Sequence, residues 1–263
     1  MRSHIPNINT IEVSAKDRVI TQGSRGNQPK WLKGGKWYKA DYLGHEGLAE
    51  YICSRVLALS SVKNFIRYTP VIIKEVESKK EYRGCVSDDF GVFLNGEVML
   101  LRLPQKYNVF LEPRKNLMEN IKVFCHGVQE IFKVDITQDF ITMLQFDQVI
   151  CNEDRILRNF GLREDEGSFF FHPLFDQGLS LLSDISSNER CFSTEDIVFK
   201  PFYLPRPQML AQGLGEIFLG LKKSEILSFK PQQNVYSGLE VDKMMDTLIK
   251  SMKKTEGIFW NNI

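Results

Sequence analysis

The sequence predicts an α+β protein of two lobes, in which strands form the first part of the chain and helices form the second. In the first part, short apolar runs are separated by turn residues such as Asn95-Gly96. After Pro113, apolar residues recur every three or four positions, which is the period of an amphipathic helix. We therefore expect a β-rich N-terminal lobe over residues 1–108 and a mostly helical C-terminal lobe over residues 109–263.

The individual elements follow from the same patterns. The expected strands are Ile11–Val13, Arg18–Thr21, Trp37–Ala40, Arg67–Ile73, Tyr82–Val86 and Glu97–Leu101. Among them we expect one helix, Glu46–Leu59, because Leu48, Ile52 and Val56 lie on one face. The expected helices of the second lobe have apolar stripes along Leu117–Ile131, along a segment that Thr137 can cap, and along Val241–Met252.

Composition excludes several function classes. The chain has 263 residues, 43% of them apolar, which is enough for a large core. A formal net charge of +1 argues against binding to nucleic acids or membranes by electrostatic attraction. No apolar run approaches the roughly 18 residues of a transmembrane helix, and the polar N-terminus is not a signal peptide. The five cysteines lack any CxxC pair and the four histidines are dispersed, so a zinc site has little support. We expect a cytoplasmic enzyme.

Two aspartates and an asparagine form the most informative pattern. Asp154 and Asn159 lie in Cys-Asn-Glu-Asp-Arg-Ile-Leu-Arg-Asn-Phe-Gly, and Asp176 lies in Leu-Phe-Asp-Gln-Gly. Between them, residues 160–163 and 168–172 read as a β-hairpin that returns Asp176 to the side of Asn159. In a kinase site, the first aspartate accepts the proton of the attacking hydroxyl, while the asparagine and the second aspartate bind magnesium on ATP. Taken alone, such residues are more often caps and turn formers.

A lysine and two glutamates upstream favour the kinase interpretation. Lys39 ends a strand that follows the Gly34-Gly35 turn, which suggests the edge of a hairpin, and a helix with Glu46 and Glu50 follows. Kinases hold a strand lysine against the ATP phosphates with a helix glutamate. Either glutamate could bind Lys39, and we expect Glu46 from its position at the helix start.

The segment Thr21–Trp31 is a candidate phosphate-binding loop. Glycines at positions 23 and 26 would allow close approach of the backbone to phosphates, and polar side chains there could donate hydrogen bonds. The candidate residues are Gly23, Ser24, Arg25, Gly26, Asn27 and Lys30. A mobile surface turn is the alternative interpretation.

These residues together resemble the HipA-like kinase family, whose bacterial toxin members are serine/threonine kinases. Gly-Asn-Gln-Pro-Lys at 26–30 resembles the phosphate loop of the family, and Lys39 resembles its phosphate lysine. The residues that match its catalytic aspartate and two metal ligands are Asp154, Asn159 and Asp176. The resemblance covers roughly residues 20–185. One position departs from it, because Ile156 stands where the family often has a histidine.

The resemblance implies a protein-kinase-like bilobal fold, bound ATP and Mg²⁺, and transfer of phosphate to a serine or threonine of a protein. It also implies a hinge at Leu101, Arg102 and Leu103 for adenine, an activation segment over residues 178–194, and an antitoxin-like protein as a candidate partner. The sequence does not identify the protein substrate. Two alternatives stay open: a nucleotide-binding regulatory module without catalysis, and a small-molecule or lipid kinase of the same fold.

Overall fold

The computed structural model describes residues 10–20, 28–107, 117–185, 225 and 235–254. Six strands form the N-terminal sheet in the order β1-β5-β6-β4-β3-β2, with only β1 and β5 parallel. Their bounds are β1 Thr10–Val13, β2 Arg18–Val19, β3 Lys30–Lys33, β4 Lys36–Ala40, β5 Thr69–Glu75 and β6 Glu81–Asp88. A short 3₁₀ helix, η1 (Ala15–Asp17), joins β1 to β2.

The β3–β4 hairpin closes through the predicted glycine turn. Gly34 and Gly35 have φ values of 59° and 70°, and Lys33 pairs with Lys36. Two successive residues with positive φ give the turn type that matches the twist of a two-residue hairpin. Lys39 lies near the end of β4, as expected for this hairpin, and in the sheet β4 lies between β3 and β6.

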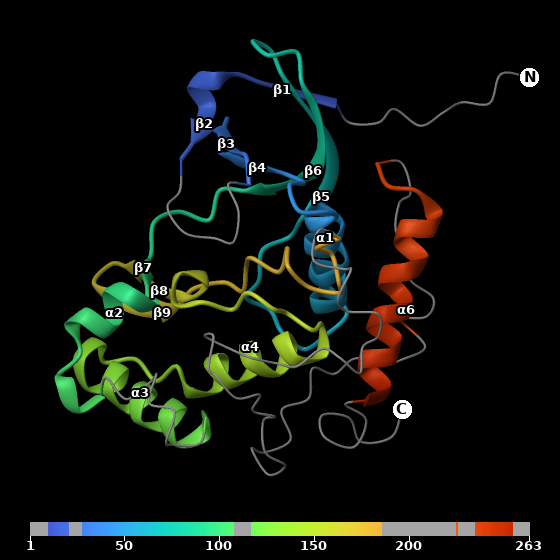
Figure 1. The fold of residues 1–263 in the computed structure, drawn as a ribbon. Helices are drawn as coiled ribbons and strands as arrows, with labels where there is room; N and C mark the ends of the chain where they lie inside the picture. The colour runs from blue at the N-terminus through green and yellow to red at the C-terminus, as the bar shows by residue number, and fades with distance from the viewer. Residues whose placement is uncertain (1–9, 21–27, 108–116, 186–224, 226–234, 255–263) are drawn as a thin grey trace, which may run out of the picture.

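Helix α1 (Glu46–Ala58) lies beneath this sheet and joins it to the rest of the molecule (Figure 1). Its buried face, with Leu48, Ile52 and Val56, belongs to the large core that also contains side chains of the C-terminal helices. A second, smaller apolar cluster, which includes Trp31 and Ile73, lies on the sheet itself.

The second part of the described chain is mainly helical and includes a small sheet (Figure 1). Its helices are α2 Gly96–Arg102, η2 Gln105–Tyr107, α3 Leu117–Phe132, α4 Thr137–Val149, η3 Leu157–Asn159 and α6 Gly238–Lys254. The three-stranded sheet consists of β7 (Leu94–Asn95), β8 (Gly161–Asp165) and β9 (Ser168–Phe171). The predicted fold class, α+β with a β-rich first lobe and a helical second lobe, is confirmed. The division at residue 108 stays a prediction, since β7 already pairs with β8.

One predicted element has the wrong type. Glu97–Leu101 is not a strand but part of helix α2, because Asn95 acts as a helix cap rather than as a hairpin turn. Its side-chain oxygen accepts the backbone N–H of Val98 at 3.1 Å. Asparagine serves both as a cap and as a turn residue, so local sequence could not separate the two. A smaller difference concerns α4, which Thr137 was expected to cap. Thr137 is instead its first residue, and the backbone N–H of Thr137 donates to the side chain of Asp135 at 2.9 Å.

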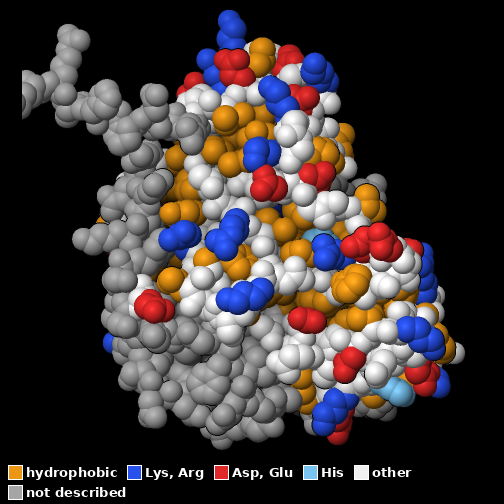
Figure 2. All heavy atoms as spheres, turned by 180° about the vertical axis from the view of Figure 1, so that it is seen from behind, with side chains coloured by type: hydrophobic (Ala, Val, Ile, Leu, Met, Phe, Trp, Pro, Cys, Tyr) orange, Lys and Arg blue, Asp and Glu red, His pale blue; other side chains and the backbone are white. Residues whose placement is uncertain are grey.

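The surface carries no concentration of one charge on the face that Figure 2 shows, where basic and acidic side chains are interspersed. This distribution agrees with the small formal net charge of +1. Among the described residues, no helix is both long and apolar enough to cross a membrane.

Candidate active site

A buried lysine lies between two carboxylates at the centre of the molecule. The Nζ atom of Lys39 lies 2.6 Å from Oε1 of Glu50 and 2.9 Å from Oδ1 of Asp176. It also lies 3.4 Å from the hydroxyl of Tyr68. Lys39 is only 4% exposed, and such a charge is stable in a protein interior only when it is paired. Two elements that are neighbours in the sequence, β4 and α1, therefore meet the distant segment after β9 at this ammonium group.

Glu50 connects the lysine to the segment that contains Asp176. Its second carboxylate oxygen accepts the backbone N–H of Gln177 at 2.9 Å. Gly178 follows, and a Cβ atom there would lie 3.3 Å from Cβ of Glu46, so the segment passes close to helix α1. The single carboxylate of Glu50 therefore fixes both the ammonium group of Lys39 and the backbone next to Asp176.

The expected pairing of Lys39 with Glu46 is wrong. The carboxylate of Glu46 turns back on the preceding loop, where it accepts the backbone N–H groups of Tyr42, Leu43 and Gly44 at 3.2, 2.6 and 2.9 Å. These N–H groups belong to the loop before the helix, and a carboxylate in the first turn is also favoured by the helix dipole. Glu46 thus stabilises the start of α1, while Glu50, one turn further on, binds the lysine.

The charges in this cluster stabilise one another. Burial alone would lower the pKa of Lys39, but Asp176 and Glu50 outweigh this effect and raise that pKa well above its usual range. Burial alone would raise the pKa of Asp176, but Lys39 and Lys30 lower it below its usual range. Asp176 is therefore a carboxylate at neutral pH.

A second ion pair holds the loop that contains Asp154 and Asn159. Arg155 binds Asp147 of helix α4 in two places, with Nε at 2.7 Å and Nη2 at 2.9 Å from the carboxylate oxygens. Its remaining Nη1 donates to the backbone oxygens of Asn159 and of Phe175, the latter at 3.1 Å. Arg155 therefore joins the backbone at Asn159 to the residue directly before Asp176, as the predicted return of the hairpin requires.

The loop itself is closed by amide side chains. The backbone N–H of Asp154 donates to the side chain of Asn152 at 3.0 Å, and Asn152 in turn donates to Asp147 at 2.8 Å. The amide nitrogen of Asn159 donates to the backbone oxygen of Asp154 at 3.0 Å. This last bond turns the oxygen of the Asn159 amide away from Asp154. The structure thus brings Asp154, Asn159 and Asp176 together on one scaffold.

Ile156, which stands where the HipA-like family often has a histidine, lies in this loop. Its backbone oxygen accepts the N–H of Asn159 at 3.0 Å, and its side chain is half-buried. The loop is held by Arg155 and Asn152, and its hydrogen bonds to Asp147 need no histidine at position 156.

The predicted hairpin is present. β8 and β9 pair with Asp165 opposite Ser168, and the two residues between them, Glu166 and Gly167, have φ values of 48° and 79°. The chain then passes to Asp176, whose own φ of 62° lies in the left-handed region. Such a conformation is uncommon for an aspartate and is maintained by the bonds around it.

The expected adenine hinge at Leu101 and Leu103 is not supported by the structure. Leu101 lies on helix α2 and is 86% exposed, whereas Leu103 is buried in the large core. The chain leaves the sheet earlier, after β6, in a segment that contains Phe90 and Phe93. These two rings pack against His172 and Phe175, with centroid separations of 4.3 to 5.4 Å.

The candidate phosphate loop can be assessed only in part. Gly23, Ser24 and Gly26 lie outside the described residues. Lys30, at the start of β3, pairs in the sheet with Lys39. Burial lowers the pKa of Lys30, while the charge of Asp176 opposes this effect. Lys30 therefore lies near enough to the cluster to share its electrostatic field, although its role in binding phosphate stays a prediction.

The residues present are suitable for magnesium. Asp176 supplies a carboxylate that is ionised at neutral pH, and Asn159 supplies an amide oxygen. Hard oxygen ligands suit Mg²⁺, which keeps several waters and takes only one or two carboxylates from a protein. Within the described part of the chain, no three His, Cys, Asp or Glu side chains form a group that could hold a metal, so a closed zinc-type site is not formed there.

Several important residues were not predicted, above all Asp147, Asn152 and Arg155. A signal was present, because Arg155 directly follows the candidate catalytic aspartate and Asp147 lies seven residues before that aspartate. A buried Arg–Asp pair cannot be recognised from sequence unless the partner is known. Tyr68, whose ring lies 5.1 Å from Nζ of Lys39, had no recognisable signal.

Comparison with known proteins supports the fold. No family model and no curated protein matches the sequence. Among solved structures, the chain is similar to the crystal structure of a Helicobacter pylori proinflammatory kinase, CtkA, with a TM-score of 0.58. The match covers 93% of this chain and 95% of that chain, at 14% sequence identity. At this identity, the likeness shows that the two chains share a fold.

Proposed function

We propose that this protein is an ATP- and magnesium-dependent phosphotransferase, and specifically a serine/threonine protein kinase of the HipA type. The observation that carries the proposal is the position of Lys39, bound at once by Glu50 of α1 and by Asp176. A strand lysine held by a helix glutamate next to a metal-binding aspartate is the arrangement by which kinases bind ATP phosphates. The fold shared with a solved kinase supports the same activity.

Each residue of the candidate site would have its own role in the transfer of phosphate. Lys39 would donate hydrogen bonds to the phosphates, and Asn159 and Asp176 would bind Mg²⁺, which neutralises phosphate charge when it is present. Asp154 would orient the attacking hydroxyl and accept its proton as the new O–P bond forms and the bond to the leaving ADP oxygen breaks. Arg155 would hold Asn159 next to Asp176, since it donates to the backbone oxygens of Asn159 and Phe175.

Adenine would bind where the chain leaves the first sheet. The segment after β6, with Phe90 and Phe93, offers aromatic rings near Asp176, because both rings also contact Phe175. We therefore place the hinge of the proposed kinase there instead of at Leu101–Leu103. Nucleotide sites are typically lined by apolar and aromatic side chains at the junction of two lobes.

The test is incubation of the purified protein with magnesium and ATP labelled on the γ-phosphate, together with a mixture of unfolded protein substrates. We expect label on serine or threonine, in the protein itself or in the added proteins, and no label with the Asp154→Asn variant. Binding of ATP without transfer would show a nucleotide-binding module instead. Transfer only to small alcohols or lipids would show a kinase of another substrate class.

Partners of this activity are proposals that rest on the family resemblance alone. A protein substrate and an antitoxin-like partner would be expected of a HipA-type toxin. The segment 178–194 is the candidate activation segment, of which residues 186–194 lie outside the described chain. Its first part is held in place, since Asp184 forms a β-bridge with Gly44 in the loop before α1.

A further inference from the structure

The loop between β4 and α1 is tied to the C-terminal helix. It begins at Asp41, whose carboxylate accepts the backbone N–H of Gly47 at 2.7 Å and the hydroxyl of Tyr236 at 3.0 Å. Tyr236 is 1% exposed and lies two residues before α6. A Cβ atom on Gly47 would lie 2.5 Å from the Tyr236 hydroxyl oxygen, so the first turn of α1 packs directly against this ring.

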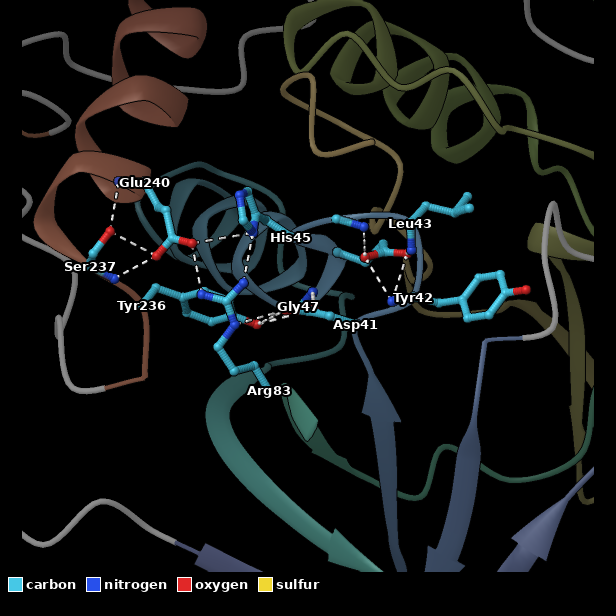
Figure 3. A network of polar contacts seen from close by, with 11 residues as sticks. Asp41, Tyr42, Leu43, His45, Gly47, Arg83, Tyr236, Ser237 and Glu240 are labelled. Carbon is cyan, nitrogen blue, oxygen red and sulfur yellow. Dashed lines mark hydrogen bonds and ion pairs between the residues drawn. The ribbon is translucent and has the colours of Figure 1, made fainter. Parts of the chain in front are cut away.

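Arg83 of β6 binds the same region, next to Tyr236 (Figure 3). Its Nη1 lies 2.7 Å from the carboxylate of Glu240, and its Nη2 lies 3.2 Å from Nδ1 of His45. Its Nε lies 4.0 Å from Asp41, and its guanidinium lies 5.1 Å from the centre of the Tyr236 ring. Arg83 thus joins the sheet, the residue before α1 and helix α6.

The two carboxylate oxygens of Glu240 bind different groups. Oε2 accepts the backbone N–H of Ser237 at 2.6 Å, while the Ser237 hydroxyl accepts the N–H of Glu240 at 3.3 Å. This reciprocal arrangement is a capping box, which fixes the start of α6. Oε1 binds Arg83. Because one side chain closes the helix and also binds the sheet, the start of α6 is held at a defined position beside α1.

The far part of α6 contacts the start of the loop that contains Asp154 and Asn159, here called the catalytic loop. Its apolar face, including Leu248 and Met252, is buried in the large core. Near its end, the hydroxyl of Ser251 accepts the thiol of Cys151 at 3.2 Å, and Cys151 lies three residues before Asp154. One helix therefore contacts the beginning of α1 and the beginning of the catalytic loop, which lie in different lobes (Figure 1).

We propose that α6 is a positioning element of the active site, and that Tyr236 and Glu240 set the position of α1 at which Glu50 reaches Lys39. Its effect on catalysis rests on the proposed function, whereas its effect on the Lys39–Glu50 pair does not. Loss of either contact would allow the start of α1 to move away from the sheet. Glu50 lies one turn into that helix, so its bond to Lys39 would open more often.

The test uses two variants and a matched control. Tyr236→Phe removes only the hydroxyl that binds Asp41. Glu240→Gln removes the charge that faces Arg83, while glutamine can still complete the capping box. The control is Tyr107→Phe, which removes a tyrosine hydroxyl bound to a carboxylate, Glu130, on helix α3 away from α1.

Two measurements need no catalytic activity. The first is the rate at which an amine-reactive ester labels Lys39 relative to Lys36, whose side chain is 50% exposed and serves as the internal reference. The second is hydrogen exchange of the backbone amides in α1. We expect both to rise about tenfold in Tyr236→Phe and Glu240→Gln, the effect of losing a hydrogen bond to a charged group, and to stay unchanged in Tyr107→Phe.

The outcomes separate this proposal from the proposed function. Unchanged labelling of Lys39 and unchanged exchange in α1 would overturn the positioning role, whether or not the protein transfers phosphate. An equal rise of labelling and exchange in Tyr107→Phe would overturn the positioning role too, because it would show that the loss of any buried tyrosine hydroxyl bond destabilises the whole protein. If the protein transfers phosphate, we expect kcat/KM for ATP to fall in the two variants by the factor by which labelling rises. If it transfers none, labelling and exchange still decide the matter.

Discussion

Two aspartates in this protein each bind a cation, but they differ in what surrounds them. Asp147 is completely buried, and three donors from Arg155 and Asn152 bind its two oxygens. Asp176 is bound by Lys39, yet its side chain keeps 18% of its surface exposed. A carboxylate whose oxygens are filled by protein donors is part of the scaffold. One that keeps an open side and an ionised state can bind a ligand from solution. The difference separates residues that support the site from residues that would act in it.

Replacing Asp176 with Asn should have the largest effect on activity, with a smaller loss of stability because Lys39 keeps its bond to Glu50. The variant keeps the size of the side chain, and asparagine tolerates the left-handed backbone at this position. We expect phosphotransfer to fall by about a thousandfold, because charge that stabilises the transition state is lost. The measurement is kcat in the labelled-ATP assay, alongside thermal unfolding. Substantial activity with magnesium would contradict the metal-binding role of Asp176.

Replacing Arg155 with Met should show the opposite pattern. It leaves Asp147 as an unpaired buried carboxylate, which costs about 3–5 kcal/mol of the free energy of unfolding. We expect a clear loss of stability in urea titration, with activity lost because Asn159 and Phe175 lose their shared donor. A double variant with Asp147→Leu should recover part of the stability, since both charges are then removed together. A stable single variant would show that Asp147 is not the scaffold residue described here.

Asp41 is a further aspartate near a cation, and its side chain, 10% exposed, lies between these two cases in burial. Burial raises its pKa from 3.8 to about 7, with the charge of Glu46 adding to the effect, while Gly47, Tyr236 and Arg83 oppose it. In the unfolded chain this group loses its proton near pH 4, whereas in the folded chain it keeps it until about pH 7. The folded state therefore binds more protons in this window and loses stability as the pH rises.

The measurement that isolates this effect is a comparison with Asp41→Asn, which does not titrate. Relative to that variant, the wild-type protein should lose about 1 kcal/mol of unfolding free energy for each pH unit between about pH 4 and pH 7. Above about pH 7 the difference should become constant. A difference that does not depend on pH would show that Asp41 titrates normally.

The two glutamates of α1 allow the same comparison, between a residue that supports the site and a residue that would act in it. Glu50→Gln should weaken phosphotransfer by about tenfold, since it removes a charge-assisted bond to Lys39 and leaves the fold nearly unchanged. Glu46→Gln should cost about 1 kcal/mol of stability, through weaker bonds to the loop before α1 and a less favourable interaction with the helix dipole, and should alter activity only in proportion. Kinetics and urea titration of both variants test this. If Glu46→Gln alone impaired ATP binding, the assignment from the structure would be wrong.

The sequence predicted the elements best where local chemistry decides them. The glycine turn at 34–35, the hairpin after Asn159 and the stripe of α6 follow from residue types that favour one conformation. It failed where one residue type serves two local structures: Asn95 capped a helix instead of forming a turn, and Glu46 bound the backbone of the loop before α1 instead of Lys39. Such choices depend on partners in three dimensions. The bond between Lys39 and Asp176 joins residues 137 positions apart, and no local pattern contains that information.

The distance along the chain between Asp41 and Tyr236 has a consequence for folding. Their hydrogen bond joins residues 195 positions apart, and the ion pair between Arg83 and Glu240 joins residues 157 positions apart. Contacts of such long range form slowly, because a large loop must close before they add stability. All the chemical groups of the lysine cluster precede α6 in the chain, and the helix that fixes α1 is synthesised after them. We therefore expect a nascent chain to contain all the candidate active-site residues before these residues are in position. The site should form only when residues 236–254 pack against α1 and the sheet.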